Sequence, residues 1–204
     1  MSAEVARAAA DETHRRGGLV MVHPTDPDGV RAAVQAGVDI VVHTTIDPPR
    51  STWSAELIGQ MVAQHVSVVP TLQLWGYELA KTTTPSDVRD ALVADAERQL
   101  AAFAGAGGQV LFGTDVGYMA DVDPTQEYAL MAHAGLTPMQ ILASLTTAPA
   151  ARWHAAERRG RIKPGLDADL VVLAGDPATD VRRFAAVTCT IRAGAEVFVR
   201  DAAR

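Results

Sequence analysis

The sequence predicts an α/β protein built on a parallel β-sheet. Three observations lead to this prediction. Short apolar runs of strand length alternate with stretches of helical periodicity. These runs are apolar throughout, as strands are when helices cover both faces of their sheet. Each run also ends in a polar or turn-forming residue, at the strand edge where the functional side chains of parallel α/β proteins gather.

Four helices and four strands alternate through the first half of the chain. Gly17 and Gly18 end the first helix, and Pro85 with Asp87 opens the fourth, because proline and acidic residues suit the first turn of a helix. Residues 72–84 are interpreted as a connecting segment. In chain order, the eight predicted elements span residues 2–16, 19–22, 28–36, 38–42, 54–64, 66–69, 85–104 and 110–112.

After residue 124 the pattern changes. Two helices are predicted, over residues 124–134 and from Thr137 onward, and a Thr-x-x-Gln capping box opens the second. Strands then dominate. Cys189, the only cysteine, lies in an alternating apolar run and is expected in a core rather than as a nucleophile. The predicted elements are a type II turn at 163–166, a strand at 169–173, and a hairpin of 187–192 with 196–200.

Composition excludes several classes of protein. A hydrophobic content of 48% places the chain among ordered globular proteins. The net charge of -6, with scattered Lys and Arg, argues against a nucleic-acid partner. No apolar run approaches the roughly 20 residues that cross a bilayer, and the first residues lack the apolar core of a secretion signal. We therefore expect a cytoplasmic protein with neither nucleic acid nor membrane as a partner.

Three residues with metal-binding side chains each follow a predicted strand: His23, His43 and Asp115. Because the carboxyl ends of parallel strands meet at one edge of the sheet, we expect the three to converge. Imidazole and carboxylate groups are typical ligands of zinc-type cations. A cation would also pair the charge of Asp115, which is costly to bury alone. For any one of them, the alternative is a hydrogen-bonded residue that only ends its strand.

Other polar and aromatic residues are weaker candidates. Asp26 and Asp28 are interpreted as turn and helix-start residues rather than extra ligands. Trp75 and Tyr77 either line a substrate pocket or cover the core. The remaining histidines are expected to face solvent on helices or at their ends: His14, His65, His133 and His154.

Several segments, in order along the chain, carry a resemblance to a known family. They are VMVH (20–23), AGVDIVVH (36–43), VPTL (69–72), GTD (113–115), TAPA (147–150), GRIKPGLDADLVVL (160–173) and DP (176–177). These segments resemble the amidohydrolase superfamily, in the branch that contains imidazolonepropionases and Xaa-Pro dipeptidase-like (prolidase-like) enzymes. The resemblance spans nearly the whole chain.

The resemblance implies a fold, a reaction and residue roles. The fold would be the C-terminal half of a TIM-type (β/α)8 barrel over residues 1–158, with part of a small β-sandwich domain over residues 159–204. His23 and His43 would bind a divalent metal, with Zn²⁺ expected as one or two ions, and Asp115 would bind metal and act as general acid/base. Metal-activated water would hydrolyse a C–N bond of a small amide, cyclic amide or dipeptide-like substrate, which Trp75 and Tyr77 would contact.

The sequence also departs from that family. The family has a strand-one His-x-His pair, and this sequence contains no His-x-His. The strand-four ligand, often a carboxylated lysine, also has no counterpart, since the only lysines are Lys81 and Lys163. Four strand–helix units are also too few for a barrel of eight. We therefore expect a truncated site that binds zinc weakly and turns over little by itself. The alternative is a non-catalytic half-barrel that associates with itself, as a homo-oligomer, or with a separate N-terminal half.

Overall fold

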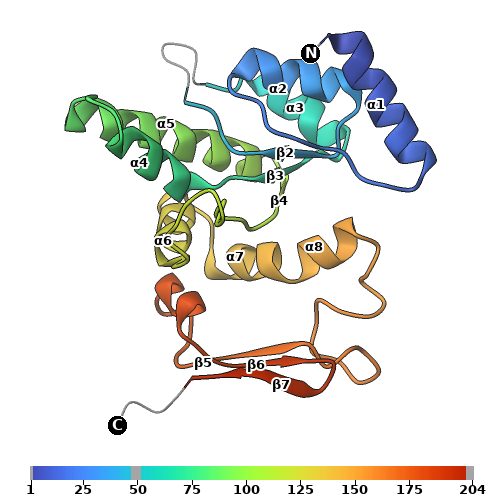
Figure 1. The fold of residues 1–204 in the computed structure, drawn as a ribbon, viewed down its shortest axis with the longest axis vertical. Coiled ribbons are helices and arrows are strands. Elements are labelled where there is room, and N and C mark those ends of the chain that lie inside the picture. The colour runs from blue at the N-terminus through green and yellow to red at the C-terminus, as the bar shows by residue number, and fades with distance from the viewer. Residues whose placement is uncertain (1, 47–51, 201–204) are drawn as a thin grey trace. The chain divides into compact units, whose positions relative to one another are not determined.

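The computed structural model describes residues 2–46 and 52–200. They form two compact units, divided between residues 121 and 122 (Figure 1). The expected domains divide instead at 158/159, a boundary that stays a prediction, and their outermost residues, Met1 and 201–204, lie outside the described residues. None of the helices in 2–46 and 52–200 has the length and apolar character that a bilayer crossing needs.

The first unit contains the predicted parallel sheet, with its strands in chain order β1–β2–β3–β4. One valine from each strand stands in register across the sheet, in the row Val22, Val41, Val68 and Val110. The α/β class and the parallel pairing are therefore confirmed, while closure into a barrel stays a prediction. The strands are β1 (Met21–Val22), β2 (Ile40–Val42), β3 (Ser67–Val69) and β4 (Gln109–Val110).

Helices precede and connect these strands, and Figure 1 shows α1, α2 and α3 gathered on one face of the sheet. Asp26 begins α2 as its N-cap, because its carboxylate accepts a hydrogen bond of 2.7 Å from Gly29 N, as a turn-forming role predicts. Gly37, with φ +86°, ends the same helix. The helices are α1 (Ala3–Arg15), α2 (Pro27–Ala36), α3 (Ala55–Ala63), α4 (Leu72–Ala80) and α5 (Ser86–Gly105).

The helix α4 corrects the interpretation of residues 72–84 as a connecting segment. It packs against α5, and its buried residues are Leu72, Leu74 and Leu79. Thr71 stands at its N-cap but makes no side-chain cap bond. Gly76 in its middle also lowers its helical propensity. Tertiary packing therefore stabilises a helix that the local sequence does not predict.

The second unit contains helices and a three-stranded antiparallel sheet in the order β5–β6–β7. Its capping box is present: Gln140 N donates to Thr137 Oγ1 at 3.2 Å, and Thr137 N donates to Gln140 Oε1 at 2.8 Å. The hairpin is confirmed, whereas α8 and η1 were not predicted. The elements are α6 (Thr125–His133), α7 (Pro138–Leu145), α8 (Thr147–Arg152), β5 (Leu170–Leu173), η1 (Val181–Ala185), β6 (Val187–Arg192) and β7 (Ala195–Val199).

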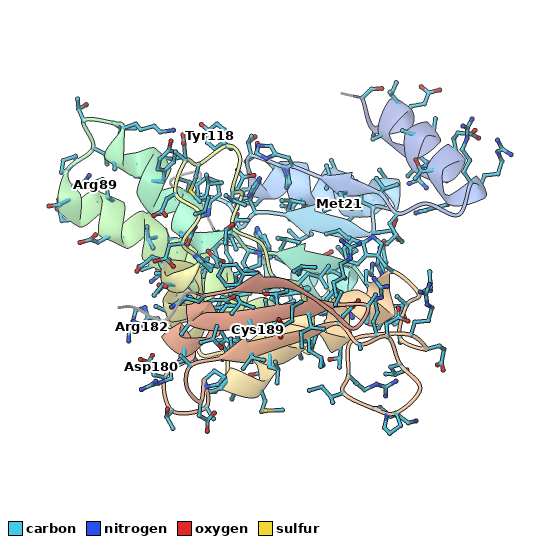
Figure 2. The ribbon with its side chains drawn as sticks, turned by 60° about the horizontal axis from the view of Figure 1, so that its bottom comes forward. Met21, Arg89, Tyr118, Asp180, Arg182 and Cys189 are labelled. Carbon is cyan, nitrogen blue, oxygen red and sulfur yellow. The ribbon has the colours of Figure 1, made fainter. Side chains whose placement is uncertain are left out.

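The turn at residues 163–166 and the position of Cys189 were both predicted from the sequence. Leu166 N donates to Lys163 O at 3.2 Å and Gly165 has φ +89°, as a type II turn requires. Cys189 lies on β6, the middle strand of the sheet (Figure 2), and is only partly buried. The core position expected for it is therefore wrong, because exposed side chains such as Val172 and Val199 flank it on the neighbouring strands.

Candidate functional site

Three residues beyond the carboxyl ends of the parallel strands have left-handed backbone. They are His43 after β2, Thr71 after β3 and Asp115 after β4, with φ of +74°, +46° and +64°. Only six non-glycine residues of the described chain have positive φ, so half of them lie at this edge. The conformation is especially unusual for a β-branched threonine. Such strain costs about 1–3 kcal/mol per residue and clusters where a structure holds functional side chains in place.

His43 is buried against the neighbouring strand, with 3% of its surface exposed. Its backbone N donates to Val69 O at 2.8 Å and Thr44 N donates to Pro70 O at 3.2 Å, so the pairing of β2 with β3 continues past both strands. The His43 ring lies with its Nδ1 2.5 Å from Thr71 Oγ1. Nδ1 is thus engaged within the fold, and Nε2 is the ring nitrogen left for a ligand.

The structure brings together the two histidines that the sequence singled out. His23 directly follows β1, and its ring meets the ring of His43 edge to face, with 4.6 Å between the centroids and 80° between the planes. His23 is exposed whereas His43 is buried. One imidazole therefore faces solvent and the other lies beneath it.

Asp115 lies further from its strand than the sequence indicated, because β4 ends at Val110 rather than at residue 112. The chain continues along β3, where Leu111 N donates to Val68 O at 2.8 Å. Gly113 then passes so close to Val69 that a Cβ on it would lie 2.5 Å from Cγ1 of that valine. Asp115 acts on His43 electrostatically. No group of three or more His, Cys, Asp or Glu side chains that could hold a metal forms within residues 2–46 and 52–200.

Burial sets the protonation state of His43. The pKa of its imidazole is lowered from the usual 6.5 to about 4, first by burial and then by His23, against the opposing effect of the Asp115 carboxylate. His43 is therefore neutral at neutral pH, which is the form that binds metal. The imidazole pair thus fits two ligand positions of a zinc-type ion, and Asp115 contributes charge nearby.

A buried amide holds the segment after His43. Gln99, on α5, accepts from Thr45 N at 2.8 Å through Oε1 and donates to Thr45 O at 2.7 Å through Nε2. Trp53 Nε1 donates to the Thr45 hydroxyl at 3.2 Å. The Gln99 amide thus replaces the backbone partner that a neighbouring strand would provide. Sequence reasoning missed Gln99 and Thr71, because each acts through a residue distant in the chain.

Trp75 borders His43, and its contact with a substrate stays a prediction. Its ring meets the His43 ring edge-on with 6.1 Å between centroids, and its Nε1 donates to Thr44 Oγ1 at 2.9 Å. The indole is partly exposed. Its polar atom is therefore bonded within the fold, and its ring lies beside that of His43.

Tyr77 lies in a different cluster, which links α4 to the loop that carries Asp115. Tyr77 and Tyr118 meet edge to face with 6.3 Å between centroids (Figure 2 labels Tyr118). The Lys81 ammonium lies 3.9 Å from the centre of the Tyr77 ring and 4.8 Å from that of Tyr118, and 2.6 Å from Glu78 Oε1. We call these four side chains the lysine–tyrosine clamp.

The four other histidines are exposed, as expected. One of them also has a structural partner: His14 Nε2 lies 2.7 Å from Asp39 Oδ2, an atom that accepts from Val20 N at 2.7 Å as well. His14 thereby links α1 to the strand connections at the opposite end of β1 and β2 from His23 and His43.

Comparison with known proteins adds sequence relatives. Residues 1–197 match the amidohydrolase family. An uncharacterised protein of Mycobacterium bovis is 31% identical over 188 residues, which are 86% of this chain and 47% of that protein. Ochratoxinase of Aspergillus niger is 25% identical over 191 residues, which are 90% of this chain and 38% of that protein. The chain thus spans less than half the length of these curated relatives.

A solved structure gives the same answer. The crystal structure of a prolidase complexed with N-methylphosphonate-L-proline matches with a TM-score of 0.81 and 26% identity, over 98% of this chain and 50% of that one. The prolidase-like part of the resemblance is confirmed, and the imidazolonepropionase part stays a prediction. With a family match that runs over nearly all of its residues, the chain belongs to the amidohydrolase family.

Proposed function

We propose that the protein hydrolyses a C–N bond in a small amide, cyclic amide or dipeptide-like substrate, and that it does so with a divalent metal, most suitably Zn²⁺. The observation that carries the proposal is the contact of His23 with His43, 4.6 Å apart at the carboxyl edge of a parallel sheet. Membership of the amidohydrolase family supports it. Likeness to a prolidase bound to a proline phosphonate favours the dipeptide-like class.

Each residue of the site has a role in this proposal. When bound, a divalent metal would polarise a carbonyl group and lower the pKa of a water molecule. His43, neutral and buried, offers Nε2 as a ligand, and His23 offers a second imidazole from the exposed side. Asp115 transfers a proton to the leaving nitrogen as general acid/base. Trp75 forms a wall for the substrate, and Tyr77, further along the same helix, contacts it as well.

We infer that the site is completed by ligands from outside this set. Catalytic zinc sites use three protein ligands, whereas the described residues bring only two imidazoles into contact. The residues matched make up only 47% and 38% of the two relatives. We therefore expect the 204 residues alone to bind Zn²⁺ weakly and to turn over little substrate.

Zinc titration of the purified chain tests the ligand assignment. We expect Zn²⁺ to shift the NMR signals of the His23 and His43 rings, and each single change, His23→Asn or His43→Asn, to weaken binding at least tenfold, because a ligand is lost. His154→Asn is the matched control, since this histidine is exposed and, like His43, has positive φ. Unchanged zinc affinity in both site variants would refute the assignment.

Hydrolysis tests the reaction and the incompleteness separately. Proline dipeptides and small acyl amides, assayed with Zn²⁺, should be cleaved slowly by the unmodified chain and not at all by Asp115→Asn. Turnover that survives Asp115→Asn argues against a general acid/base at this position. Tight stoichiometric zinc together with rapid turnover by the unmodified chain argues against the need for further ligands.

The second candidate function is association without catalysis, with a second copy or with a separate N-terminal half. It is favoured by the exposure of large apolar side chains on β5 and β7: Val171, Val172, Val197, Phe198 and Val199 are each 47–59% exposed. The outer strands β1 and β4 of the parallel sheet also pair on one side only within the described residues. Exposed apolar patches and unpaired strand edges are typical of association surfaces.

A further inference from the structure

The hydroxyl of Thr71 is placed between two groups of the candidate site. Thr71 is buried, with 1% of its surface exposed. Its Oγ1 donates to Pro70 O at 2.9 Å and lies 2.5 Å from His43 Nδ1. A hydroxyl has one proton to donate, and here that proton is used on Pro70 O. With that proton on Pro70 O, the bond to His43 runs from Nδ1–H to Oγ1 and leaves the lone pair of the neutral ring on Nε2.

The position of this hydroxyl is enforced by the backbone around it. Thr71 adopts φ +46°, which a β-branched residue rarely does, directly after Pro70. His43 N bonds to Val69 O and Thr44 N bonds to Pro70 O, so the segments that carry the two side chains are tied to each other. The ring and the hydroxyl thus have little freedom to separate.

The need of the Pro70 carbonyl for a hydrogen-bond donor does not explain why the Thr71 hydroxyl lies beside His43. Pro70 O already accepts from Thr44 N at 3.2 Å and lies 3.5 Å from Thr44 Oγ1. It would keep a hydrogen-bond partner without the Thr71 hydroxyl. The bond to Thr71 is instead the contact that the structure gives for the buried ring nitrogen of His43.

We propose that Thr71 is a positioning residue, which fixes the Nδ1–H tautomer and the orientation of the His43 ring and so presents Nε2 to a metal. The metal part of this inference rests on the proposed function. Histidines that bind metals generally donate their other ring N–H to a neighbouring acceptor, and loss of that acceptor typically lowers metal affinity about 10–100-fold.

Long-range ¹H–¹⁵N correlation of the histidine rings, at pH 7.5 without metal, tests the tautomer directly. The full chain and Thr71→Ser, which keeps the hydroxyl, should show His43 protonated on Nδ1. Thr71→Val has the same shape without an acceptor, and it should show loss of the Nδ1–H signature. Thr44→Val removes a neighbouring buried hydroxyl that contacts Trp75 and Pro70, and should leave the tautomer as it is. An unchanged tautomer in Thr71→Val overturns the inference.

A second variant covers the case in which Thr71→Val does not fold. Thr71→Gly also lacks the hydroxyl and suits a positive φ, so it reads the tautomer in a relaxed backbone. Titration with Zn²⁺ alone then tests the ligand: affinity should fall about 10–100-fold in Thr71→Val or Thr71→Gly and be retained in Thr71→Ser. Equal affinity in all variants overturns the presentation of Nε2. If the unmodified chain binds no Zn²⁺, the proposed metal site fails, while the tautomer result still decides whether Thr71 positions the ring.

Discussion

At His43, burial and the neighbouring His23 both oppose the protonated ring. The pKa of about 4 in the folded chain compares with 6.5 for an exposed histidine. Between these two values the unfolded chain binds a proton that the folded chain does not. The contribution of His43 to stability is therefore complete above about pH 6.5 and is lost as the pH falls toward 4.

The metal-free chain should lose stability in acid because of this residue. From pH 7.5 to pH 5 we expect a loss of about 2 kcal/mol in the free energy of unfolding through His43 alone, as the linkage relation gives for such a pKa difference. Urea unfolding at the two pH values measures it. His43→Asn, which tolerates the positive φ, should remove this part of the loss, whereas His154→Asn should not. Equal acid sensitivity of His43→Asn and the unmodified chain would contradict the assigned pKa.

Between elements, α5 constrains the site through Gln99. The amide of Gln99 bonds to both backbone groups of Thr45, two residues after His43. Gln99 is 2% exposed and Thr45 is 0% exposed, so water cannot replace these bonds without opening the structure. α5 thus fixes the direction in which the chain leaves the candidate site.

Removal of this amide should be strongly destabilising. Gln99→Leu leaves two buried backbone groups without their partner, at about 1–3 kcal/mol for each such group, so we expect a loss of about 3 kcal/mol in unfolding free energy. Denaturant midpoints measure this loss. Arg98→Ala, at the exposed neighbouring position, should change stability by no more than about 0.5 kcal/mol. If Gln99→Leu were as mild as Arg98→Ala, the Gln99 bonds would not hold the segment.

The lysine–tyrosine clamp connects α4 to the loop of Asp115. In that loop, Tyr118 N and Met119 N both donate to Asp115 O at 3.2 Å, so the backbone of the proposed acid/base belongs to the clamped turn. We expect Lys81→Met to speed hydrogen exchange at these two amides several-fold, because the cation between the two tyrosine rings is removed. The other lysine offers the control: Lys163→Met should leave their exchange rates unchanged. Equal exchange in both variants would show that the clamp does not hold the loop.

The sequence predicted elements well where signals are local. The apolar runs before His23 and His43 mark strands, and both residues were identified because each directly follows one. The helix α4 was missed because Gly76 in its middle lowers its helical propensity, and because its packing against α5 is not visible in the local sequence. Thr71 and Gln99 were missed for another reason: their partners lie 28 and 54 residues away, and no local pattern encodes such contacts. The short β4 placed Asp115 further from its strand than expected.

At the scale of the whole molecule, each unit contains an open sheet. In the three-stranded sheet, Val171 and Phe198 lie in one row across β6, and Val172 and Val199 lie in the next. Since side chains alternate between faces along a strand, apolar side chains are exposed on both faces. The chain also matches only about half of its prolidase neighbour. These exposed surfaces are the reason for proposing association as the second candidate function.

Self-association should therefore be measurable and sensitive to this sheet. We expect sedimentation velocity across a concentration series to show a dimer or larger species, and Val197→Lys to raise its dissociation constant at least tenfold by placing a charge on an apolar contact. Val88→Lys is the control, because Val88 is a similarly exposed valine on α5. A monomer at every concentration would refute association of the chain with itself.

The register of the parallel sheet determines where the two imidazoles lie relative to each other. Each histidine directly follows the last residue of its own strand, and the row of valines shows how those strands align. A slip of β2 by a single residue would send the His43 side chain to the opposite face. Insertions in the turn after His23 or in the connection after Thr45 would leave this alignment of the two histidines unchanged. The lengths of the connections can therefore differ between relatives, whereas one residue added inside β2 would separate the two imidazoles.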